Sequence, residues 1–415
     1  MDVFMPKQCL LFFILMLFTT MPFTKIYAYE TDNKNNIITV SPSNDPIATT
    51  QDLQKAITYL SGRPDTNQQW AIKLKPQKYF LTQQISTTGL KNTTITSFDA
   101  SQPAQLIKAP NWDSAKSGEY ILSLRMCDHI TISNIEFYGQ TDFSKSVNSF
   151  WPDQGVYIGS CNIVNIDSNK FYNFGNAALR VVTDAKDPVK GVNSFKTHVT
   201  HNTFNNIYQT ATTATDLVHG GTAQSTWDYN TFYNIRGSIK FASRVEGAKH
   251  IEFFNNTING GDHFGLEVNN YNDFKIKGNT IKNIKDAAIT IYTGAADIVK
   301  NGFPWGDDFI ITNNDIEKCG RGIRYSHEAF PDGSNNTPQN LVINDNTVEN
   351  LSDPNTPAIF IGNGVIDNLQ MNNNQLLSIT NKKAIELGKD VHIINAQNNT
   401  LDKTMLQLTL PAISK

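Results

Sequence analysis

Charged side chains recur at equivalent positions in several short apolar strands of this sequence. Arg180 stands in "ALRVV", Lys240 in "SIKFA", Glu267 in "GLEVN" and Arg324 in "GIRYS". Successive side chains of a strand point to opposite faces, so the apolar flanking residues point inward and each charged residue points outward. If these strands stack side by side, the four charged residues form one outer strip.

The same strip would carry further polar and aromatic side chains. The segment "TATDLVHGG" is ambiguous, because either Asp216 or Val218 takes the outward place, with His219 close by. The last coils contribute Phe360 and Glu386 without comparable partners. In chain order, the remaining expected members are Tyr157, Thr290 with Tyr292, and His327 beside Arg324.

Such a strip could support β-elimination from a uronate sugar. The sugar carboxylate must be neutralised, which acidifies the C5 proton, and a base must then remove that proton. Arg180 and Arg324 could clamp the carboxylate, because a guanidinium group binds a carboxylate through two hydrogen bonds. Lys240 is the candidate base, and Tyr292 or His219 is the reserve acid or base.

Three alternatives remain open. Lys240 and Glu267 could form an ordinary cross-strand ion pair that contributes under about 1 kcal/mol. A glycoside hydrolase could use Asp216 and Glu267, which would lie about 9.6 Å apart, near the limit for an inverting enzyme. A non-catalytic protein could bind glycans through aromatic residues such as Tyr157, Tyr292 and Trp305.

Long loops are expected to border this surface. They include "GAADIVKNGFPWGDD", which contains Trp305, and "HEAFPDGSNNTP" after Arg324. Long loops grouped around one surface usually serve binding. The candidate substrate-binding residues are therefore Tyr157, Asp216, Arg244, Asn269, Trp305 and His327.

A short phrase that begins with Asn repeats from about residue 165 onward, in forms such as "NTF", "NTI" and "NTL". Its asparagines are Asn169, Asn202, Asn230, Asn256, Asn279, Asn314, Asn346, Asn374 and Asn399. A fixed phrase with a variable remainder is typical of stacked coils that share one core. The pattern predicts an all-β fold, a right-handed parallel β-helix, with an internal ladder of hydrogen-bonded Asn side chains.

The segment from Thr49 to Arg63 has the helical period, with Thr49 or Thr50 as a possible cap. A helix there would cover the open end of the stack. We expect a signal peptide over residues 1–28, a cap and first coil over 29–90, and the β-helix over 91–415, with cap and coils forming one domain.

The helix, the segment "LKPQKYFLTQQI", the segment "NTTITS" and the Asn-rich coils together resemble the pectate-lyase-like β-helix superfamily. That superfamily includes polysaccharide lyases, polygalacturonases, uronate epimerases and non-catalytic surface proteins. The resemblance to its chondroitin and alginate lyases implies a Lys base, an Arg partner and often Ca²⁺, for which Glu267 is the candidate ligand. Near the place of their Ser-Lys-Ser phrase this chain has "FASRVEG", with Arg244 where a Lys would be expected.

The fold also places Cys127 and Cys161 at equivalent positions of consecutive coils, about 4.8 Å apart. We expect a disulfide between them, with a reduced, stacked pair as the alternative. Cys319 is expected to be buried and inert.

The N-terminal run "CLLFFILMLF" predicts a secretory signal peptide cleaved after Ala28, or alternatively an uncleaved anchor. We therefore expect a secreted or periplasmic monomer with no membrane contact after cleavage. The net charge of -3 argues against a nucleic-acid partner and leaves an acidic polysaccharide as the expected ligand.

Overall fold

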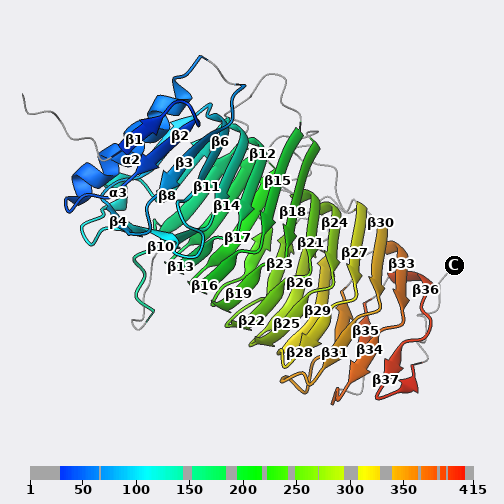
Figure 1. Cartoon of the computed structure of the whole chain (residues 1–415). Helices are drawn as coiled ribbons and strands as arrows, with labels where there is room; N and C mark the ends of the chain where they lie inside the picture. Colours follow the sequence, from blue (N-terminus) through cyan, green and yellow to red (C-terminus); the bar gives the residue numbers. More distant parts are fainter. Residues whose placement is uncertain are drawn as a thin grey trace, which may run out of the picture.

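The computed structural model describes residues 29–64, 67–143, 152–183, 194–216, 222–241, 248–269, 271–293, 307–327, 339–362, 366–380, 384–388 and 391–406. The expected signal peptide, residues 1–28, lies outside this range. The described residues form an elongated stack of coils in which almost all strand pairing is parallel (Figure 1). The predicted right-handed parallel β-helix is confirmed.

Each coil contributes one strand to each of three faces of the stack. The first face is a 14-stranded sheet. Its strands are β1 (Tyr29–Asp32), β2 (Ile37–Val40), β3 (Trp70–Leu74), β6 (Lys91–Ser97), β9 (Asp128–Ser133), β12 (Asn162–Asp167), β15 (Ser194–Thr200), β18 (Thr222–Asp228), β21 (Ala248–Phe254), β24 (Tyr271–Lys277), β27 (Asp307–Thr312), β30 (Gln339–Asn344), β33 (Ile366–Asn372) and β36 (Val391–Asn395).

The second face is a 13-stranded sheet. Its strands are β4 (Lys78–Leu81), β7 (Ala104–Lys108), β10 (Ile135–Tyr138), β13 (Lys170–Phe174), β16 (Thr203–Ile207), β19 (Thr231–Ile235), β22 (Thr257–Gly261), β25 (Thr280–Ile284), β28 (Asp315–Glu317), β31 (Thr347–Glu349), β34 (Gln375–Leu377), β37 (Thr400–Leu401) and β38 (Thr404–Met405).

The third face is divided into two sheets. The N-terminal sheet has five strands: β5 (Ile85–Thr88), β8 (Tyr120–Arg125), β11 (Gln154–Gly159), β14 (Ala177–Thr183) and β17 (Thr210–Asp216). The C-terminal sheet has six: β20 (Ile239–Phe241), β23 (Leu266–Asn269), β26 (Ala287–Thr293), β29 (Arg321–His327), β32 (Ile359–Ile361) and β35 (Ile385–Leu387). This face carries most of the predicted site residues.

The core consists of inward side chains that stack on their equivalents in the next coil. Phe137, Phe171, Phe204 and Phe232 form one such column, with ring centroids 4.8 to 5.1 Å apart. The spacing equals the distance between neighbouring strands, so each ring contacts the next one directly.

The predicted Asn ladder is confirmed. The Asn202 side-chain amide donates to Asn230 Oδ1 (3.0 Å) and to the carbonyl oxygen of Ile166 (2.8 Å), and each later coil repeats this arrangement. The nine asparagines are all nearly inaccessible to solvent. The residue before each of them adopts a positive φ, for example 57° at Ser168, which turns the chain between the first and second faces.

The N-terminal end is covered by α2 (Pro46–Ser61), which buries Leu53, Ala56, Ile57 and Leu60 as the periodicity predicts. The expected cap at Thr49 or Thr50 is wrong, because the helix begins earlier and Asp45 accepts from the backbone N–H of Ile47 (2.9 Å). Pro46 favours this start, since its fixed φ suits the first turn of a helix.

Cys127 and Cys161 lie on neighbouring coils as expected, because Asp128 pairs with Asn162. The predicted disulfide is absent, and both residues are free, buried thiols. Hydrogen bonds to the main chain orient the two sulfur atoms: Cys161 Sγ accepts from the backbone N–H of Cys127 (3.3 Å), and Cys127 Sγ donates to Arg125 O (3.2 Å). Cys319 is fully buried, as expected, and burial raises the pKa of its thiol to about 12.

Candidate functional site

The C-terminal sheet of the third face confirms one part of the predicted strip. Lys240 on β20 pairs with Glu267 on β23, which pairs with Thr290 on β26 and then with Arg324 on β29. The column continues through Phe360 and Glu386. The apolar residues on either side of each of these residues predict this alignment, and the register agrees at every step.

The N-terminal part of the strip belongs to the other sheet. Tyr157 and Arg180 are in register with each other and then with Thr213, so the prediction that Asp216 or Val218 takes this place is wrong. Asp216 instead pairs with Thr183 at the end of the strands. Within the described residues, one isolated bridge from Thr210 to Ser238 joins the two sheets. Arg180 is therefore separated from Lys240 by a complete coil and by a break in the sheet.

Arg180 has its own aromatic surroundings on the N-terminal sheet. Burial raises the pKa of Tyr120, and the charge and hydrogen bond of Arg180 offset part of this increase. The Tyr120 and Tyr157 rings lie 5.0 Å apart, and the Arg125 guanidinium lies 4.7 Å from the Tyr157 ring centroid. This cluster packs tightly against itself, since Tyr157 is only 6% exposed.

Glu267 is the centre of a buried polar network on the C-terminal sheet. Its Oε1 accepts from Lys240 Nζ (2.7 Å) and from the Asn269 amide (3.0 Å), while its Oε2 accepts from the Ser238 hydroxyl (3.0 Å). Burial alone would raise the pKa of the Glu267 carboxyl, but Lys240 and the hydrogen bonds outweigh burial and lower that pKa. Glu267 is therefore an anchored carboxylate.

This network does not fit the expected Ca²⁺ ligand role of Glu267. Both of its oxygens accept from N–H or O–H donors, whereas Ca²⁺ requires a shell of several oxygen ligands. Within the described ranges, no group of three or more His, Cys, Asp or Glu residues is close enough to hold a metal ion.

Tyr292 and Arg324 form the second half of the site. Arg324 Nη1 donates to the Tyr292 hydroxyl (3.5 Å), and the guanidinium carbon lies 5.6 Å from the ring centroid. Burial raises the pKa of Tyr292, and Arg324 offsets only part of this increase, so the phenol is neutral near pH 7. Arg324 has no ion-pair partner among the residues that the structure describes.

The two halves converge. Lys240 reaches one strand forward to Glu267, and Arg324 reaches one strand back to Tyr292. The Lys240 ammonium group thus contacts a residue of β23, and the Arg324 guanidinium contacts a residue of the neighbouring strand β26, where Tyr292 is in register with Asn269. Between them Thr290 is fully buried, and its hydroxyl lacks a hydrogen-bond partner among the described residues.

A pocket of about 260 Å³ adjoins Arg324 on its C-terminal side. The sequence does not predict this pocket, because Phe360 and Glu386 have no comparable partners in the expected strip. The strand register places both residues beside Arg324, but no sequence pattern predicts that the turn with Thr356 and Pro357 completes a pocket there. The lining residues are Arg321, Ile323, Arg324, Thr356, Pro357, Phe360 and Glu386.

The structure does not place every predicted residue. His219, Arg244 and Trp305 lie outside the described residues. Asp216 and His327 are described only by their strand positions, at the ends of β17 and β29. The structure therefore brings together Lys240, Glu267, Asn269, Tyr292 and Arg324, and it separates Tyr157 and Arg180 from them.

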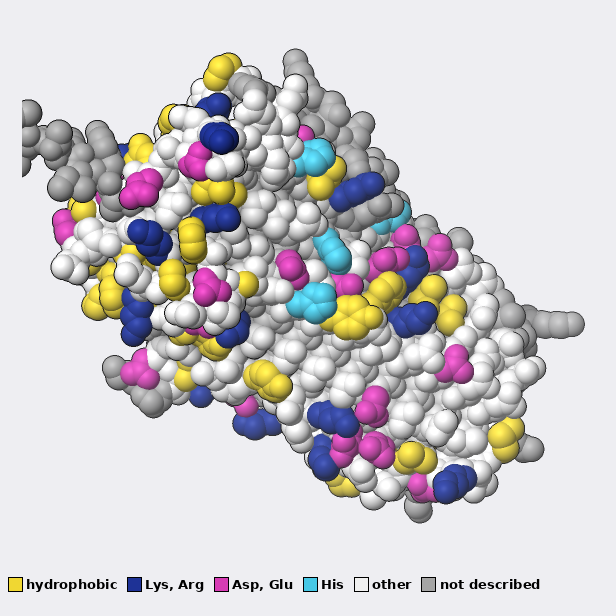
Figure 2. All heavy atoms as spheres, in the orientation of Figure 1, with side chains coloured by type: hydrophobic (Ala, Val, Ile, Leu, Met, Phe, Trp, Pro, Cys, Tyr) yellow, Lys and Arg dark blue, Asp and Glu magenta, His cyan; other side chains and the backbone are white. Residues whose placement is uncertain are grey.

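Positive charge is local on the surface. On the face shown in Figure 2, Lys and Arg side chains are interspersed with Asp and Glu side chains. Lys282, for example, pairs with Asp315 (3.2 Å) and Glu317 (2.9 Å). Among the described residues, no helix is long and apolar enough to span a membrane.

Comparisons with known proteins agree on the architecture. A family model described as "Right handed beta helix region" matches residues 120–303. The comparison with curated proteins gave no match.

Several solved structures share the fold at low sequence identity. One is the tailspike protein gp49 of Acinetobacter baumannii bacteriophage Fri1, a capsular polysaccharide depolymerase (TM-score 0.52, 12% identity, 91% of this chain and 66% of that chain). Another is the catalytic unit of the GH87 α-1,3-glucanase from Streptomyces thermodiastaticus (0.51, 12%, 93% and 71%). A third is ORF18 of Geobacillus virus E2 (0.50, 12%, 82% of this chain), of which this chain spans 61%. At this identity the likeness shows the fold.

Proposed function

We propose that this chain is a polysaccharide-active β-helix protein that binds an acidic glycan along β20–β35 and cleaves it by β-elimination. The observation that carries the proposal is the Arg324–Tyr292 pair. It combines a guanidinium without a described ion-pair partner and a neutral phenol, 3.5 Å apart, at the rim of a pocket. Two proteins of the same fold are described as acting on polysaccharides, which supports the broader part of the proposal.

Arg324 would bind the carboxylate of a uronate sugar through two hydrogen bonds and thereby acidify its C5 proton. Tyr292 would donate its proton to the glycosidic oxygen at C4 as that bond breaks. The electron pair left by the C5 proton forms the C4–C5 double bond, so no water is consumed.

Lys240 remains the candidate base, in a more restricted role than the sequence suggests. Its ammonium group is held by Glu267 at 2.7 Å, and only an uncharged amine could accept the C5 proton. The fixed contact with Glu267 would hold the Lys240 nitrogen over β23, next to the sugar bound at Arg324.

The adjoining pocket would hold the next sugar of the chain. Its volume of about 260 Å³ suits one pyranose ring, with Phe360 as an apolar surface and Glu386 and Thr356 as polar groups at its sides. An inverting hydrolase that uses Asp216 and Glu267 is less well supported, because Asp216 is out of register with the column.

A non-catalytic glycan-binding protein is the second candidate. The observation that favours it is the Lys240–Glu267 ion pair, because a lysine that is held by a carboxylate as an ammonium group cannot act as a base. In that case Arg324 and the pocket would bind an acidic sugar without cleaving it.

Elimination can be followed by the ultraviolet absorbance of the new C4–C5 double bond, with alginate, pectate, chondroitin, hyaluronan and heparin as substrates. We expect turnover on at least one polymer and a reduction of about 10²-fold or more in Tyr292→Phe. Arg324→Lys should weaken both binding and turnover, because Lys lacks the bidentate geometry.

Lys282→Ala removes a cation on another face and should leave turnover unchanged. If the folded protein binds an acidic polymer but never produces the double bond, the non-catalytic candidate replaces elimination.

A further inference from the structure

The pocket beside Arg324 contains a second arginine, which the proposed cleavage does not use. Arg321 and Arg324 both line this pocket, and both belong to β29. Neighbouring residues of a strand are about 3.3 Å apart, so the Cα atoms of the two arginines lie about 10 Å from each other at one level of the stack. The pocket therefore receives positive charge from two separate positions on the same strand.

The guanidinium group of Arg321 has donors that the protein leaves unused. Its Nε lies 3.6 Å from Asp286 Oδ1, which is too long for a hydrogen bond, and its side chain is 39% exposed. Within the part of the chain that the structure describes, Arg321 donates no hydrogen bond. A guanidinium carries five N–H donors in a fork that fits an oxyanion. An anionic group in the pocket would therefore satisfy donors that have no other partner there.

The acidic residues near the pocket leave its β29 end cationic. Asp286 approaches Arg321 at Nε and is not one of the lining residues. Glu386 is the one acidic residue among the described residues that line the pocket. It lies on β35, and Phe360 separates it from Arg324 in the strand register, so two strand spacings, about 9.6 Å, lie between them. Positive charge thus gathers at one end of the pocket and negative charge at the other.

The wall opposite the strands is fixed to the residues that precede Arg321. The backbone N–H of Ser352 donates to Cys319 O (2.8 Å), and the Thr356 hydroxyl donates to Gly320 O (3.3 Å). Thr356 itself lines the pocket. Because this turn is hydrogen-bonded to the same segment that leads into β29, the pocket is preorganised next to Arg321.

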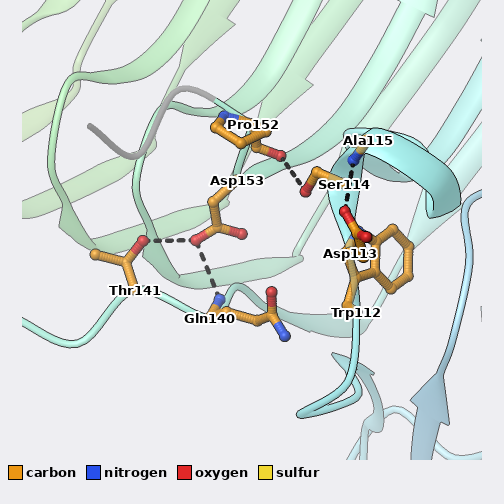
Figure 3. A pocket seen from close by; sticks show the side chains of 8 residues that line it. All are labelled: Trp112, Asp113, Ser114, Ala115, Gln140, Thr141, Pro152 and Asp153. Atoms are coloured by element: carbon orange, nitrogen blue, oxygen red, sulfur yellow. Dashed lines mark hydrogen bonds between the residues drawn. The ribbon is translucent and has the colours of Figure 1, made fainter.

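A larger hollow, of about 500 Å³, shows the opposite situation. Its acidic residues already have cationic partners: Asp153 pairs with Lys108 (3.0 Å), and Asp113 pairs with Lys116 (3.3 Å) of the short helix α3 (Ser114–Ser117). Size alone therefore does not select the better ligand site, and the unused donors favour the pocket at Arg321. The hollow is lined by residues 112–115, 140–141 and 152–153 (Figure 3).

These observations point to the charge of the sugar in the smaller pocket, given the proposed binding of a uronate at Arg324, on which this inference rests. We propose that Arg321 is a specificity-determining residue that binds an anionic group of the sugar in the pocket. The preferred glycan then carries anionic groups on two neighbouring sugars. The second group is a carboxylate or a sulfate ester, because a guanidinium binds either oxyanion. Hydroxyl groups of the same sugar would face Glu386.

Calorimetry on the full chain tests this specificity in the Tyr292→Phe background, where the proposed cleavage is slow. Tetragalacturonate and a chondroitin sulfate tetrasaccharide carry anionic groups on neighbouring sugars, as carboxylates and as a carboxylate with a sulfate ester. Hyaluronan and unsulfated chondroitin tetrasaccharides carry them on alternate sugars. We expect at least one of the first two to bind at least about tenfold more tightly than both of the others. Which of the two binds identifies the second group.

Arg321→Gln should remove this preference. It should weaken binding of the preferred tetrasaccharide by at least about tenfold and change binding of the hyaluronan tetrasaccharide by less than about twofold. Lys318→Gln is the matched control, because it removes the same charge from the same coil outside the pocket, at a side chain that is 62% exposed. It should leave the binding of all four tetrasaccharides unchanged.

The inference is overturned by the absence of binding, by equal binding of the four tetrasaccharides, or by a preference that survives Arg321→Gln. An equal loss in Lys318→Gln would also overturn it, since that result would show general attraction between charges. Elimination is assayed separately in the wild-type protein. A preference that depends on Arg321 stands even if no C4–C5 double bond forms, whereas elimination without that preference supports the proposed function and removes this inference.

Discussion

Glu267 shows how one buried carboxylate can organise a surface. Three donors hold it, and two of them, Ser238 and Asn269, are themselves buried. An unpaired charge at this position would be strongly destabilising, so Lys240 and the two polar neighbours form one unit with it. The position of the Lys240 nitrogen thus depends on Glu267.

We predict that Glu267→Gln lowers the free energy of unfolding at neutral pH by about 1–3 kcal/mol, because it removes the charge that Lys240 and the buried donors compensate. The lowered pKa of Glu267 means that its stabilising effect is complete above the pKa of the unfolded chain and is lost as the pH falls through the folded-state pKa. The difference between wild type and variant should therefore shrink in acid.

Urea unfolding at neutral and acidic pH measures this difference. Glu252→Gln, which breaks the exposed pair with Lys275, is the matched control and should change the free energy of unfolding by less than about 1 kcal/mol. Equal effects of the two substitutions would contradict the assigned role of Glu267.

At the scale of single residues, the sequence predicted positions better than contacts. The places of Lys240, Glu267 and Arg324 followed from their apolar neighbours. The disulfide between Cys127 and Cys161 did not form despite correct adjacency, because the orientation of each sulfur depends on local main-chain hydrogen bonds. Spacing along the chain does not report that orientation.

The Asn ladder is the element that fixes each coil to the next. Asn256 accepts from the backbone and side-chain N–H groups of Asn230 and donates to Trp227 O and Asn279 Oδ1. Its removal would leave several buried groups without partners.

We predict that Asn256→Ala lowers the free energy of unfolding by about 3 kcal/mol or more, since each unsatisfied buried group costs about 1–3 kcal/mol. Thermal and denaturant unfolding provide the measurement. Asn259→Ala, which removes only an exposed contact with Asn283 (2.8 Å), should shift the free energy of unfolding by about 0.5 kcal/mol or less. A comparable effect at both positions would mean that the ladder contributes little stability.

The register error at Asp216 has a specific cause at the level of the strand. The strand β17 reads "TATTATD", and its polar Thr212 points into the core, where its hydroxyl accepts from the Trp227 indole N–H (3.2 Å). An alternating pattern predicts a strand only when its inward residues are apolar. The inward, hydrogen-bonded Thr212 breaks that pattern, so the register of β17 could not be predicted from the sequence. Strands with an apolar or aromatic side chain on both sides of the outward residue, such as Leu266 and Val268 around Glu267, show the register that the sequence predicts.

The whole molecule is a stack whose N-terminal end must be covered. The helix α2 covers it and buries Leu53, which is 2% exposed. We predict that Leu53→Glu lowers the free energy of unfolding by more than about 3 kcal/mol and promotes self-association, because it exposes core and strand edges.

Sedimentation velocity and thermal unfolding measure both effects. Gln51→Glu introduces the same charge at an exposed position of the same helix and should leave the protein unchanged. A Leu53→Glu protein that stays as stable as wild type and sediments like it would show that the cap is dispensable.

Overall architecture was the most predictable level, because the Asn phrase marks every coil from Asn169 onward. The division of the third face into two sheets was not predictable, since it arises where β17 and β20 fail to pair continuously. This division separates Arg180 from Lys240 and limits the candidate site to the C-terminal sheet.

The central claim is elimination at the Arg324–Tyr292 pair. It is tested most directly by digesting an acidic polysaccharide in water enriched in oxygen-18 and measuring the masses of the products by mass spectrometry. Elimination breaks the C4–O bond without adding water, so the account predicts unsaturated products that carry no heavy oxygen. Products that contain one heavy oxygen for each bond cleaved, at one of the two new chain ends, would show hydrolysis and contradict the account. Intact polymer after incubation with the folded protein would contradict it as well.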